Sequence, residues 1–386
     1  MKIIFLNYEY PPLGGGAANA TKHILKEYAS FSDVEIDLVT SASDNKKSVE
    51  KISKNVTIHY LPIGDKNDSL NYQSPKDLLI YSHKALWYGY KLMKKGKHDL
   101  IHAFFTVPCG VLAYTLAKRF RVPYIVSLRG ADVPGFSDRF TLLYHLLRIP
   151  IRFIWKRAEA VVSNSDGLKE LAHETLPQQE ISIIKNGVDT TMFHQRARGL
   201  SKEGFVIICA ARLSRRKGFK YAVEAFEKIH QKHPTARLMF VGGEGDAAED
   251  LHGIVQKEDL NDVVTFTGHV AHEEMPGYYH QAHVFLLPSL NEGMSNNLLE
   301  AMASGLPIIM TPTGGAKELI EEEKNGFLVP MKDAKAIEEK IEIMISRPDL
   351  REEMGQESRR RAEALSWKNV AKEYRDLYKK TITHKK

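Results

Sequence analysis

Short apolar runs alternate with helix-period segments along most of this 386-residue chain, and no other feature restricts its fold as much. Each run has the length of a buried strand, and the segments between the runs, such as residues 18–29 and 220–233, repeat apolar side chains at helical spacing. This order is typical of βαβ units with a parallel sheet. The runs that we expect to form strands are residues 2–7, 35–40, 56–62, 99–105, 123–128, 159–165, 181–186, 205–210, 236–241, 263–268, 283–288, 306–311 and 326–330.

The length of the chain predicts two domains, because a single hydrophobic core rarely supports so many residues. A polar, weakly periodic stretch over residues 186–204 separates the two series of runs and indicates a linker. Each half begins with a strand and a glycine-rich or basic loop, so we expect two Rossmann-like halves in succession. The amphipathic segment 366–380 can pack on either half.

Composition is that of an ordinary globular protein, with 43% apolar and 26% charged residues. The net charge of +6 suits anionic ligands but does not indicate nucleic acid. Cys109 and Cys209 fall in different halves, which favours buried thiols over a disulfide. The N-terminus lacks a signal-peptide pattern and no apolar run is long enough to span a membrane. We therefore expect a cytoplasmic protein.

Two loops that follow strands of the first half carry residues suited to ligand binding. Glycines at residues 14–16 allow close approach of the backbone, and the next helix offers its N-terminus; a merely flexible loop is the alternative. The spacing matches neither a dinucleotide fingerprint nor a P-loop. After the run 123–128, Arg129 and Asp132 flank a glycine. They either form a salt bridge that stabilises the turn or bind hydroxyls or charge on a ligand.

A basic loop follows the first strand of the second half. The spacing of Arg212 and Lys217 lets both side chains converge on one anion, and together they can neutralise a diphosphate without a metal ion. We expect Arg215 and Arg216, which lie between them, to face solvent. An ordinary solvent-facing turn is the alternative.

The next loop resembles a dinucleotide fingerprint but does not complete one. Gly243, Gly245 and Ala248 match GxGxxA between a strand and a helix. The following strand ends in Gly268 and His269, where a dinucleotide site needs an acid to hold the ribose. The sequence therefore argues against a nicotinamide or flavin site.

The stretch "NEGMSNNLLEAMASGLP", residues 291–307, combines two glutamates with a short helix. Asn297 is expected to cap the helix and Glu300 to complete a capping box, with the helix between residues 297 and 304. Gly305 suits the left-handed position after a helix. Backbone N–H groups just before the cap form an anion site at the positive helix end.

No motif of the sequence indicates a metal site or an activated nucleophile. The sequence has no HExxH, no histidine and cysteine cluster and no GxSxG elbow. Four loops of the second half instead present anion-binding or hydroxyl-binding groups at strand ends. We interpret them as a nucleotide-diphosphate site without a metal ion and without a cofactor.

These motifs resemble the retaining glycosyltransferases of family 4, and the likeness covers nearly the whole chain. The most specific element is the E-x7-E pair of Glu292 and Glu300, supported by residues 14–16, 186–189, 212–218 and the loop at Gly268. The resemblance implies the α/β GT-B fold, in which two Rossmann-like domains face each other across a deep cleft. It also implies that the last helix returns to the first domain, so we expect an acceptor-binding domain of residues 1–190 with 366–386, and a donor-binding domain of residues 191–365.

The resemblance also assigns roles to residues. Glu292 would hold the transferred sugar near the reaction centre, and Glu300 would bind the ribose hydroxyls. Arg129 and Asp132 join Glu292 as candidate catalytic residues, although Arg129 stands where the family often has histidine. The candidate donor-binding residues are Arg212 and Lys217 for the diphosphate, Gly268, His269 and Val270 beside the base, Gly293, Met294, Ser295, Asn296, Asn297 and Leu298 near the sugar, and Gly15, Gly16 and Gly243.

The implied reaction is metal-independent transfer of a hexosyl unit, with retention, from a UDP- or GDP-sugar to a hydroxyl acceptor. Departure of the phosphate develops negative charge that cations and N–H dipoles stabilise. Two other classes stay open: a GT-B sugar-nucleotide epimerase such as a UDP-N-acetylglucosamine 2-epimerase, and a non-catalytic sugar-nucleotide binder. An acid/base set beside C2 is not evident for the epimerase, and intact Glu292, Glu300, Arg212 and Lys217 argue against the binder.

The acceptor is expected to be a sugar or a lipid-linked hydroxyl used in cell-surface polysaccharide or glycolipid synthesis. Residues 140–160 mix large apolar side chains with Arg148, Arg152, Lys156 and Arg157. This segment either lies on the inner, anionic surface of the membrane or packs as a helix on the first domain, with Pro150 interrupting it.

Overall fold

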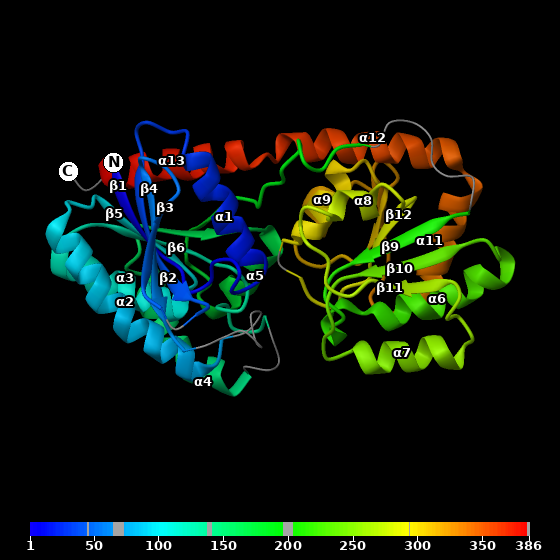
Figure 1. The fold of residues 1–386 in the computed structure, drawn as a ribbon, viewed down its shortest axis with the longest axis horizontal. Helices are drawn as coiled ribbons and strands as arrows, with labels where there is room; N and C mark the ends of the chain where they lie inside the picture. Colours follow the sequence, from blue (N-terminus) through cyan, green and yellow to red (C-terminus); the bar gives the residue numbers. More distant parts are fainter. Residues whose placement is uncertain (45, 65–72, 137–140, 196–203, 293, 384–386) are drawn as a thin grey trace. The chain divides into compact units, whose positions relative to one another are not determined.

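The computed structural model of the protein describes residues 1–383 except 45, 65–72, 137–140, 196–203 and 293, with the backbone alone at 141–145. The chain forms two compact units (Figure 1). Unit 1 comprises Met1–Asn186 with Trp367–Lys386, and unit 2 comprises Gly187–Ser366. Every expected run forms a strand.

Unit 1 contains a sheet in the order β3-β4-β2-β1-β5-β6-β7-β8, in which only β3 is antiparallel to its neighbour. Its central strands are almost wholly buried, because helices cover a parallel sheet on both faces. The exposed edge strand β3 has no buried face and was not predicted. The strands are β1 (Lys2–Leu6), β2 (Glu35–Ala42), β3 (Ser48–Lys51), β4 (Val56–Pro62), β5 (Leu100–Phe104), β6 (Tyr124–Ser127), β7 (Ala160–Ser163) and β8 (Ile181–Ile183).

Connections of unit 1 divide its helices between the two faces of the sheet. The chain moves one way along the sheet from β1 to β2 and the other way from β4 through β8, so right-handed crossovers place α1 on one face and α2 to α5 on the other. The helices are α1 (Gly16–Tyr28), α2 (Pro75–Lys95), the short kinked turn η1 (Thr106–Gly110), α3 (Val111–Phe120), α4 (Thr141–Trp155), α5 (Asp166–Thr175) and α13 (Trp367–Thr383).

The final helix α13 packs beside α1. The Tyr28 hydroxyl donates to the carbonyl oxygen of Ala371 over 3.0 Å, and the rings of His23 and Trp367 stack. At the sheet, His102 lies within hydrogen-bonding distance of Tyr378 and Ser127. Burial, reinforced by the nearby Arg129, lowers the pKa of His102. This polar network fixes α13 on unit 1.

Unit 2 contains a fully parallel sheet in the order β11-β10-β9-β12-β13-β14. This is the doubly wound arrangement, and the direction of winding reverses between β9 and β12. The elements are β9 (Val206–Ala210), the 3-10 turn η3 (Arg215–Lys217), α6 (Phe219–Lys232), β10 (Arg237–Val241), α7 (Ala248–Lys257), β11 (Val264–Phe266), α8 (Met275–Tyr279), β12 (Val284–Leu287), α9 (Asn296–Ala303), β13 (Ile308–Met310), α10 (Ala316–Leu319), β14 (Gly326–Leu328), α11 (Ala334–Ser346) and α12 (Pro348–Ala364).

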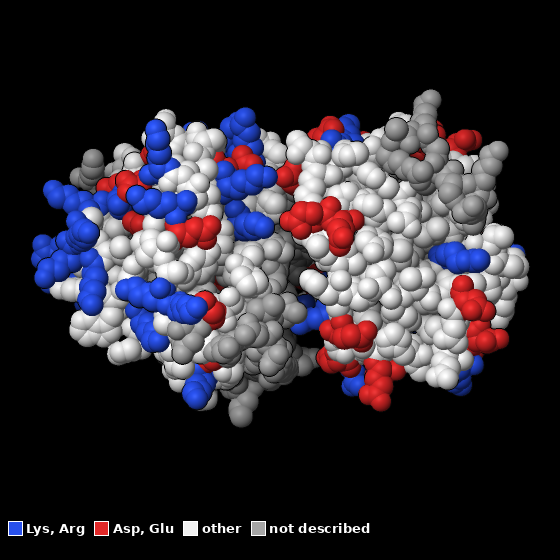
Figure 2. All heavy atoms as spheres, viewed as in Figure 1, with Lys and Arg blue, Asp and Glu red and all other residues white. Residues whose placement is uncertain are grey.

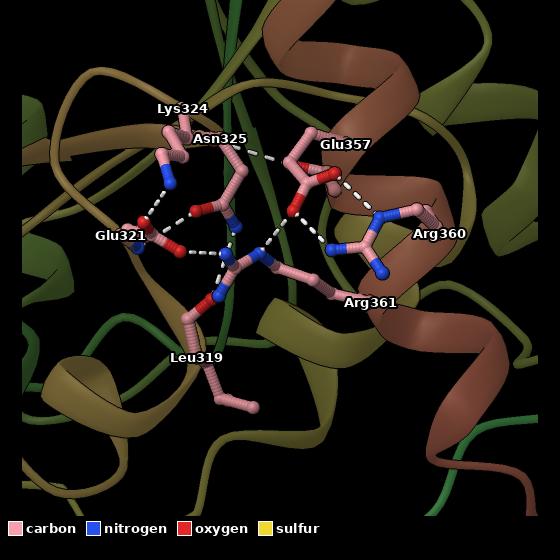
Figure 3. A network of polar contacts seen from close by, with 8 residues as sticks. Leu319, Glu321, Lys324, Asn325, Glu357, Arg360 and Arg361 are labelled. Carbon is pink, nitrogen blue, oxygen red and sulfur yellow. Dashed lines mark hydrogen bonds and ion pairs between the residues drawn. The ribbon is translucent and has the colours of Figure 1, made fainter.

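A surface network connects α12 to the segment between α10 and β14 (Figure 3). The Arg361 guanidinium binds both Glu357, one turn earlier on the helix, and Glu321. Arg360 also binds Glu357, and Lys324 binds Glu321. Hydrogen bonds from Arg360, together with Arg361, lower the pKa of Glu357 to about 2. The network holds α12 at its C-terminal half, although exposed ion pairs contribute little free energy.

Candidate functional site

The reversal of winding in unit 2 brings the loops after β9 and β12 together. These strands are adjacent and parallel, with Ile208 paired to Phe285. The loop after β9 ends in η3 and begins α6, whereas the loop after β12 leads to α9. Because ligands of open α/β sheets bind at the carboxyl ends of strands on either side of such a reversal, we take these loops as the centre of the candidate site.

An ion pair between Lys217 and Glu292 joins the two loops. The Ser289 hydroxyl donates to the same carboxylate over 2.9 Å, and the backbone N–H of Leu290 donates to the carbonyl oxygen of Arg216 over 2.8 Å. Only 12% of the Lys217 side chain and 9% of the Glu292 side chain are exposed. Burial alone would raise the pKa of Glu292, but the charge and hydrogen bond of Lys217, together with Arg216 and Ser289, outweigh it and hold the pKa below its usual value.

Gly218 allows these loops to approach each other. Its φ is +65°, and an added Cβ would lie 2.1 Å from the carbonyl oxygen of Pro288. Any other residue would therefore collide with the end of β12 and strain the backbone. The position of Lys217 depends on this glycine.

Arg212 differs from Lys217 in its surroundings. Its side chain is exposed, whereas that of Lys217 binds Glu292. The glycines after β10 pack on the Arg212 segment: an added Cβ would lie 2.3 Å from the Ala211 carbonyl oxygen at Gly242 and 2.4 Å from that of Leu213 at Gly245. Convergence of Arg212 and Lys217 on one anion stays a prediction.

The GxGxxA-like loop therefore has a packing role, and it also borders the next loop. The backbone N–H of Gly242 donates to the carbonyl oxygen of Gly268 over 3.1 Å, and Gly268 has a φ of +70°. The open side of Gly243 lies next to the Cβ of His269. Val270 packs partly buried against the core of unit 2. The structure thus places Gly243 and residues 268–270 together.

The start of α9 corrects one prediction. The N-cap is Ser295, whose hydroxyl accepts the N–H of Leu298, and not Asn297, which lies inside the helix. Asn296 is the first helical residue, and Gly293 lies outside the described residues. Gly305 has the expected positive φ, at +76°. Ser295, Asn296 and Asn297 all have side chains suited to cap a helix. Ser295 is the cap because it has the extended backbone conformation that precedes the first turn.

Two predicted donor-binding side chains belong to the core. Met294 is 7% exposed and lies against Gly315, where an added Cβ would be 2.7 Å from its terminal methyl group. Leu298 is 1% exposed. At both positions the backbone alone is suited to contact a ligand.

Glu300 does not complete a capping box, because its side chain turns into unit 2. One carboxylate oxygen lies 3.0 Å from Nε2 of His272, and the other accepts the Tyr279 hydroxyl over 3.1 Å. Burial, together with the charge of Glu300, raises the pKa of Tyr279 well above its usual value. His272 and Tyr279 were not predicted, because they come from distant parts of the chain and match no motif.

In unit 1, Gly14 of the loop after β1 packs against the partly buried side chain of Glu9. An added Cβ at Gly14 would lie 2.7 Å from the Glu9 carboxylate, and the φ of Gly14 is +92°. Burial raises the pKa of Glu9 to about 7, although the Gly15 N–H bonds to it and opposes the rise. Gly15 caps α1 and Gly16 begins it, with open space beside Gly15. Glu9 was not predicted to matter.

Arg129 and Asp132 do not form a salt bridge with each other, which was one of the two alternatives that the sequence allowed. The buried Asp132 carboxylate accepts the backbone N–H groups of Thr106 over 2.7 Å and of Arg129 over 2.9 Å. Burial raises its pKa despite these bonds. The Arg129 guanidinium donates to Asn186 over 3.1 Å and lies over the Phe104 ring, while its Nε and Nη2 are buried without a hydrogen-bond partner. Catalytic roles for both residues stay predictions.

The described part of the chain contains no group of three or more histidine, cysteine, aspartate or glutamate residues arranged to hold a metal ion. Cys109 and Cys209 are both buried free thiols. Among the helices that the structure describes, none has the length and apolar content needed to cross a membrane.

Solved structures of similar fold define the class. Sucrose-phosphate synthase of Thermosynechococcus elongatus superimposes with a TM-score of 0.86 at 23% identity, covering all of both chains. The Anabaena protein Alr3699/HepE, solved in complex with UDP-glucose, gives a TM-score of 0.74 at 20% identity, covering 98% of this chain and all of that one. The fold is therefore that of the GT-B glycosyltransferases, as predicted.

Sequence comparisons then give the family. The model described as Glycosyltransferase Family 4 matches residues 14–192, and the model described as Glycosyl transferases group 1 matches residues 191–361. The putative glycosyltransferase EpsD of Bacillus subtilis is 31% identical over 79% of this chain and 81% of its own length. An enzyme of Escherichia coli named UDP-Gal:alpha-D-GlcNAc-diphosphoundecaprenol alpha-1,3-galactosyltransferase is 27% identical over 86% and 85%. The chain belongs to the group 1, family 4 glycosyltransferases.

Proposed function

We propose that this glycosyltransferase moves a hexosyl unit from a nucleotide-diphosphate sugar to a hydroxyl acceptor with retention and without a divalent metal ion. The observation that carries the proposal is the Lys217–Glu292 pair at the winding reversal of unit 2. A lysine held at a strand end by a carboxylate is preorganised to meet a phosphate. The adjacent N-terminus of α9 adds backbone N–H groups and a positive dipole.

The charges of the site fit the bond that breaks. Cleavage of the anomeric C–O bond leaves negative charge on the departing phosphate and positive charge on the sugar. Lys217, together with Arg212 of the same loop, would neutralise the phosphate, and the released Glu292 carboxylate would hold the sugar hydroxyls. The departing phosphate would take the proton of the acceptor hydroxyl as that oxygen bonds to the anomeric carbon from the same face.

Glu300 is suited to bind the ribose of the donor. Each of its carboxylate oxygens accepts at most one bond from His272 or Tyr279, which leaves lone pairs for two adjacent hydroxyls. His272 and Tyr279 would keep the carboxylate from rotating. A uridine or guanosine base would then lie beside residues 268–270.

We further propose a UDP-hexose as donor and a lipid-linked sugar as acceptor, in the synthesis of a cell-surface polysaccharide or glycolipid at the cytoplasmic side of the membrane. The name of the Escherichia coli relative, which gives UDP-Gal as donor and a diphosphoundecaprenol-linked acceptor, supports this choice. The HepE structure in complex with UDP-glucose supports the uridine donor.

The test uses a panel of UDP-, GDP- and ADP-sugars with lipid-linked and soluble sugar acceptors, with nucleoside diphosphate release as the readout. We expect release from a UDP-hexose that needs acceptor, persists in EDTA and gives a product with the anomeric configuration of the donor by NMR. Inversion at the anomeric carbon, or dependence on a divalent ion, would contradict the proposal. Formation of an epimer from donor alone would instead indicate the epimerase.

A further inference from the structure

The outer surface of α2, α3 and α4 on unit 1 carries most of the exposed large apolar side chains found among the described residues. We call it the α2–α4 surface. Several of its apolar side chains are mostly exposed to solvent: Ile149 is 77%, Leu146 72%, Leu79 72% and Trp87 58% exposed. Val111 and Phe153 are exposed to a smaller extent. Exposed large apolar side chains gathered on neighbouring helices are typical of a surface that contacts a partner or a membrane.

The three helices form one layer. Gly89 of α2 lies against Leu116 of α3, where an added Cβ would be 2.9 Å from the leucine side chain. Tyr114 of α3 meets Phe153 of α4 edge to face, with ring centroids 5.0 Å apart. The buried Ile154 and Trp155 fix α4 on the sheet, so its exposed residues face outward together. Helix α4 therefore packs on unit 1, which is one of the two predicted alternatives, and it also carries an exposed apolar face.

The charge of the α2–α4 surface is almost entirely positive. Within residues 75–95, 111–121 and 146–157, the only acidic residue is Asp77, which is buried and caps α2. Figure 2 shows lysine and arginine side chains gathered at the left of the view, where Figure 1 places α2 and α3. The exposed cations are Lys76, Lys84, Lys91, Lys94, Lys95, Lys118, Arg119, Arg121, Arg148, Arg152, Lys156 and Arg157.

The opposite face of the same sheet shows that this distribution is local. There α1 and α13 mix lysines with Glu27, Glu373 and Asp376, and none of their large apolar side chains is strongly exposed. On the near face the basic region ends at α5, which carries Asp166 and Glu170. Overall net charge therefore does not account for the pattern.

We propose that the α2–α4 surface docks this enzyme on an anionic lipid bilayer. Exposed leucine and isoleucine side chains gain from entering the acyl region, while lysine and arginine remain among the lipid phosphates. Trp87 and Tyr90, with ring centroids 6.4 Å apart, have the amphipathic rings that favour the level of the head groups. A nucleic acid would use the cations but not Leu146 and Ile149, so the bilayer fits both properties of the surface.

Docking is independent of the proposed reaction, and its test requires no substrate. The chain has three tryptophans, of which Trp155 and Trp367 are buried, so Trp87 reports on the surface. With vesicles of phosphatidylcholine and phosphatidylglycerol at low salt, we expect a blue shift of tryptophan emission and protection from acrylamide. Phosphatidylcholine vesicles should give neither, and Trp87→Phe should abolish the shift while retaining sedimentation with vesicles.

Two variants separate charge from apolar insertion. Lys91→Glu/Lys94→Glu/Lys95→Glu should weaken vesicle binding by roughly 100-fold or more, at about fivefold for each lost lysine contact. Leu146→Gln/Ile149→Gln should weaken it about tenfold without changing the salt dependence. The matched control Lys368→Glu/Lys372→Glu/Lys380→Glu, on α13, changes the same charge on the opposite face and should have little effect.

Three outcomes would overturn the proposal: no vesicle binding at low salt, an equal loss in the α13 control, or binding to DNA that exceeds binding to vesicles. Glu292→Gln should bind vesicles like the wild type even if it is inactive. Failure of the proposed reaction thus leaves a different signature from failure of docking.

Discussion

The two units share the doubly wound strand order, but an ion pair joins loops after the strands of unit 2, whereas Glu9 and Arg129 in loops of unit 1 are not paired among the described residues. In unit 2, Lys217 and Glu292 pair across the winding reversal, with Ser289 and backbone groups completing the contacts. In unit 1, the backbone N–H of Gly15 donates to the Glu9 carboxylate, and Nε and Nη2 of Arg129 are buried without a hydrogen-bond partner. The ion pair of unit 2 holds its side chains in one arrangement, which suits the binding of one defined anion. Neither Glu9 nor Arg129 has a described opposite charge beside it, so the protonation and stability of that site depend on pH. We infer that unit 2 holds the donor and that unit 1 adapts to the acceptor.

The largest effect is expected at the paired site. Lys217→Met should lower kcat/KM by roughly 100- to 1,000-fold, because it removes a preorganised charge from the departing phosphate. The variant Lys220→Met, in the next turn on an exposed position, should retain wild-type activity. Equal rates for Lys217→Met and the wild type would remove the distinction between the units.

Glu292→Gln sharpens the same comparison. It keeps the shape of the side chain but not its charge, so we expect donor binding to be spared while turnover falls. Steady-state kinetics together with donor titration would separate the two. Turnover equal to that of the wild type would exclude a role for the carboxylate charge in holding the sugar.

Gly218 tests whether the pairing depends on close backbone contact. Gly218→Ala should reduce the free energy of unfolding by about 3 kcal/mol or more, since its Cβ meets the end of β12 at a positive φ. Gly253→Ala is the matched control, because this helical glycine of α7 has open space around it and the substitution should stabilise by up to about 1 kcal/mol. Urea denaturation of both variants gives the comparison.

The carboxyl group of Glu9 in unit 1 should make the free energy of unfolding depend on pH. The pKa of Glu9 rises from 4.5 to about 7 on folding, so the folded chain binds more protons between these values. Its contribution to the free energy of unfolding is therefore complete below pH 4.5 and is lost as pH rises toward 7, by an amount on the order of 3 kcal/mol. Glu9→Gln should remove this loss, whereas Glu170→Gln on exposed α5 should keep it.

The smallest effect is expected in the partly exposed ion-pair network of Figure 3. Glu357→Gln removes the carboxylate that binds Arg360 and Arg361, but these contacts lie on the surface. We expect a loss below about 1 kcal/mol that disappears at high salt. Thermal unfolding at low and high salt would measure it, and a loss of several kcal/mol would mean that the network supports the core.

Local patterns were enough to predict most of the fold. Strands such as β1 and β9 are continuous apolar runs because both of their faces are buried, and such runs are visible in a sequence. The edge strand β3, "SVEK", is exposed and polar, so nothing in its residues distinguishes it from a loop. At α9 the predicted cap was two residues late, since Ser295, Asn296 and Asn297 all have capping side chains and propensity alone does not rank them.

Contacts between distant residues could not be predicted in the same way. Lys217 and Glu292 were both recognised from their loops, but their mutual ion pair depends on β9 and β12 being neighbours. His272 and Tyr279 bind Glu300 across 28 and 21 residues, and Asp132 binds Thr106 across 26. Side chains of these types are common, so their roles follow only from the packing of the elements that carry them.

Titration of UDP and GDP into the protein by calorimetry tests the central claim most directly. The wild type should bind one of these diphosphates with the same affinity in EDTA as with Mg²⁺, and Lys217→Met should bind it at least about tenfold more weakly, because the loss of one charged contact costs well over 1 kcal/mol. Binding that appears only with Mg²⁺, or an unchanged affinity in Lys217→Met, would contradict the account.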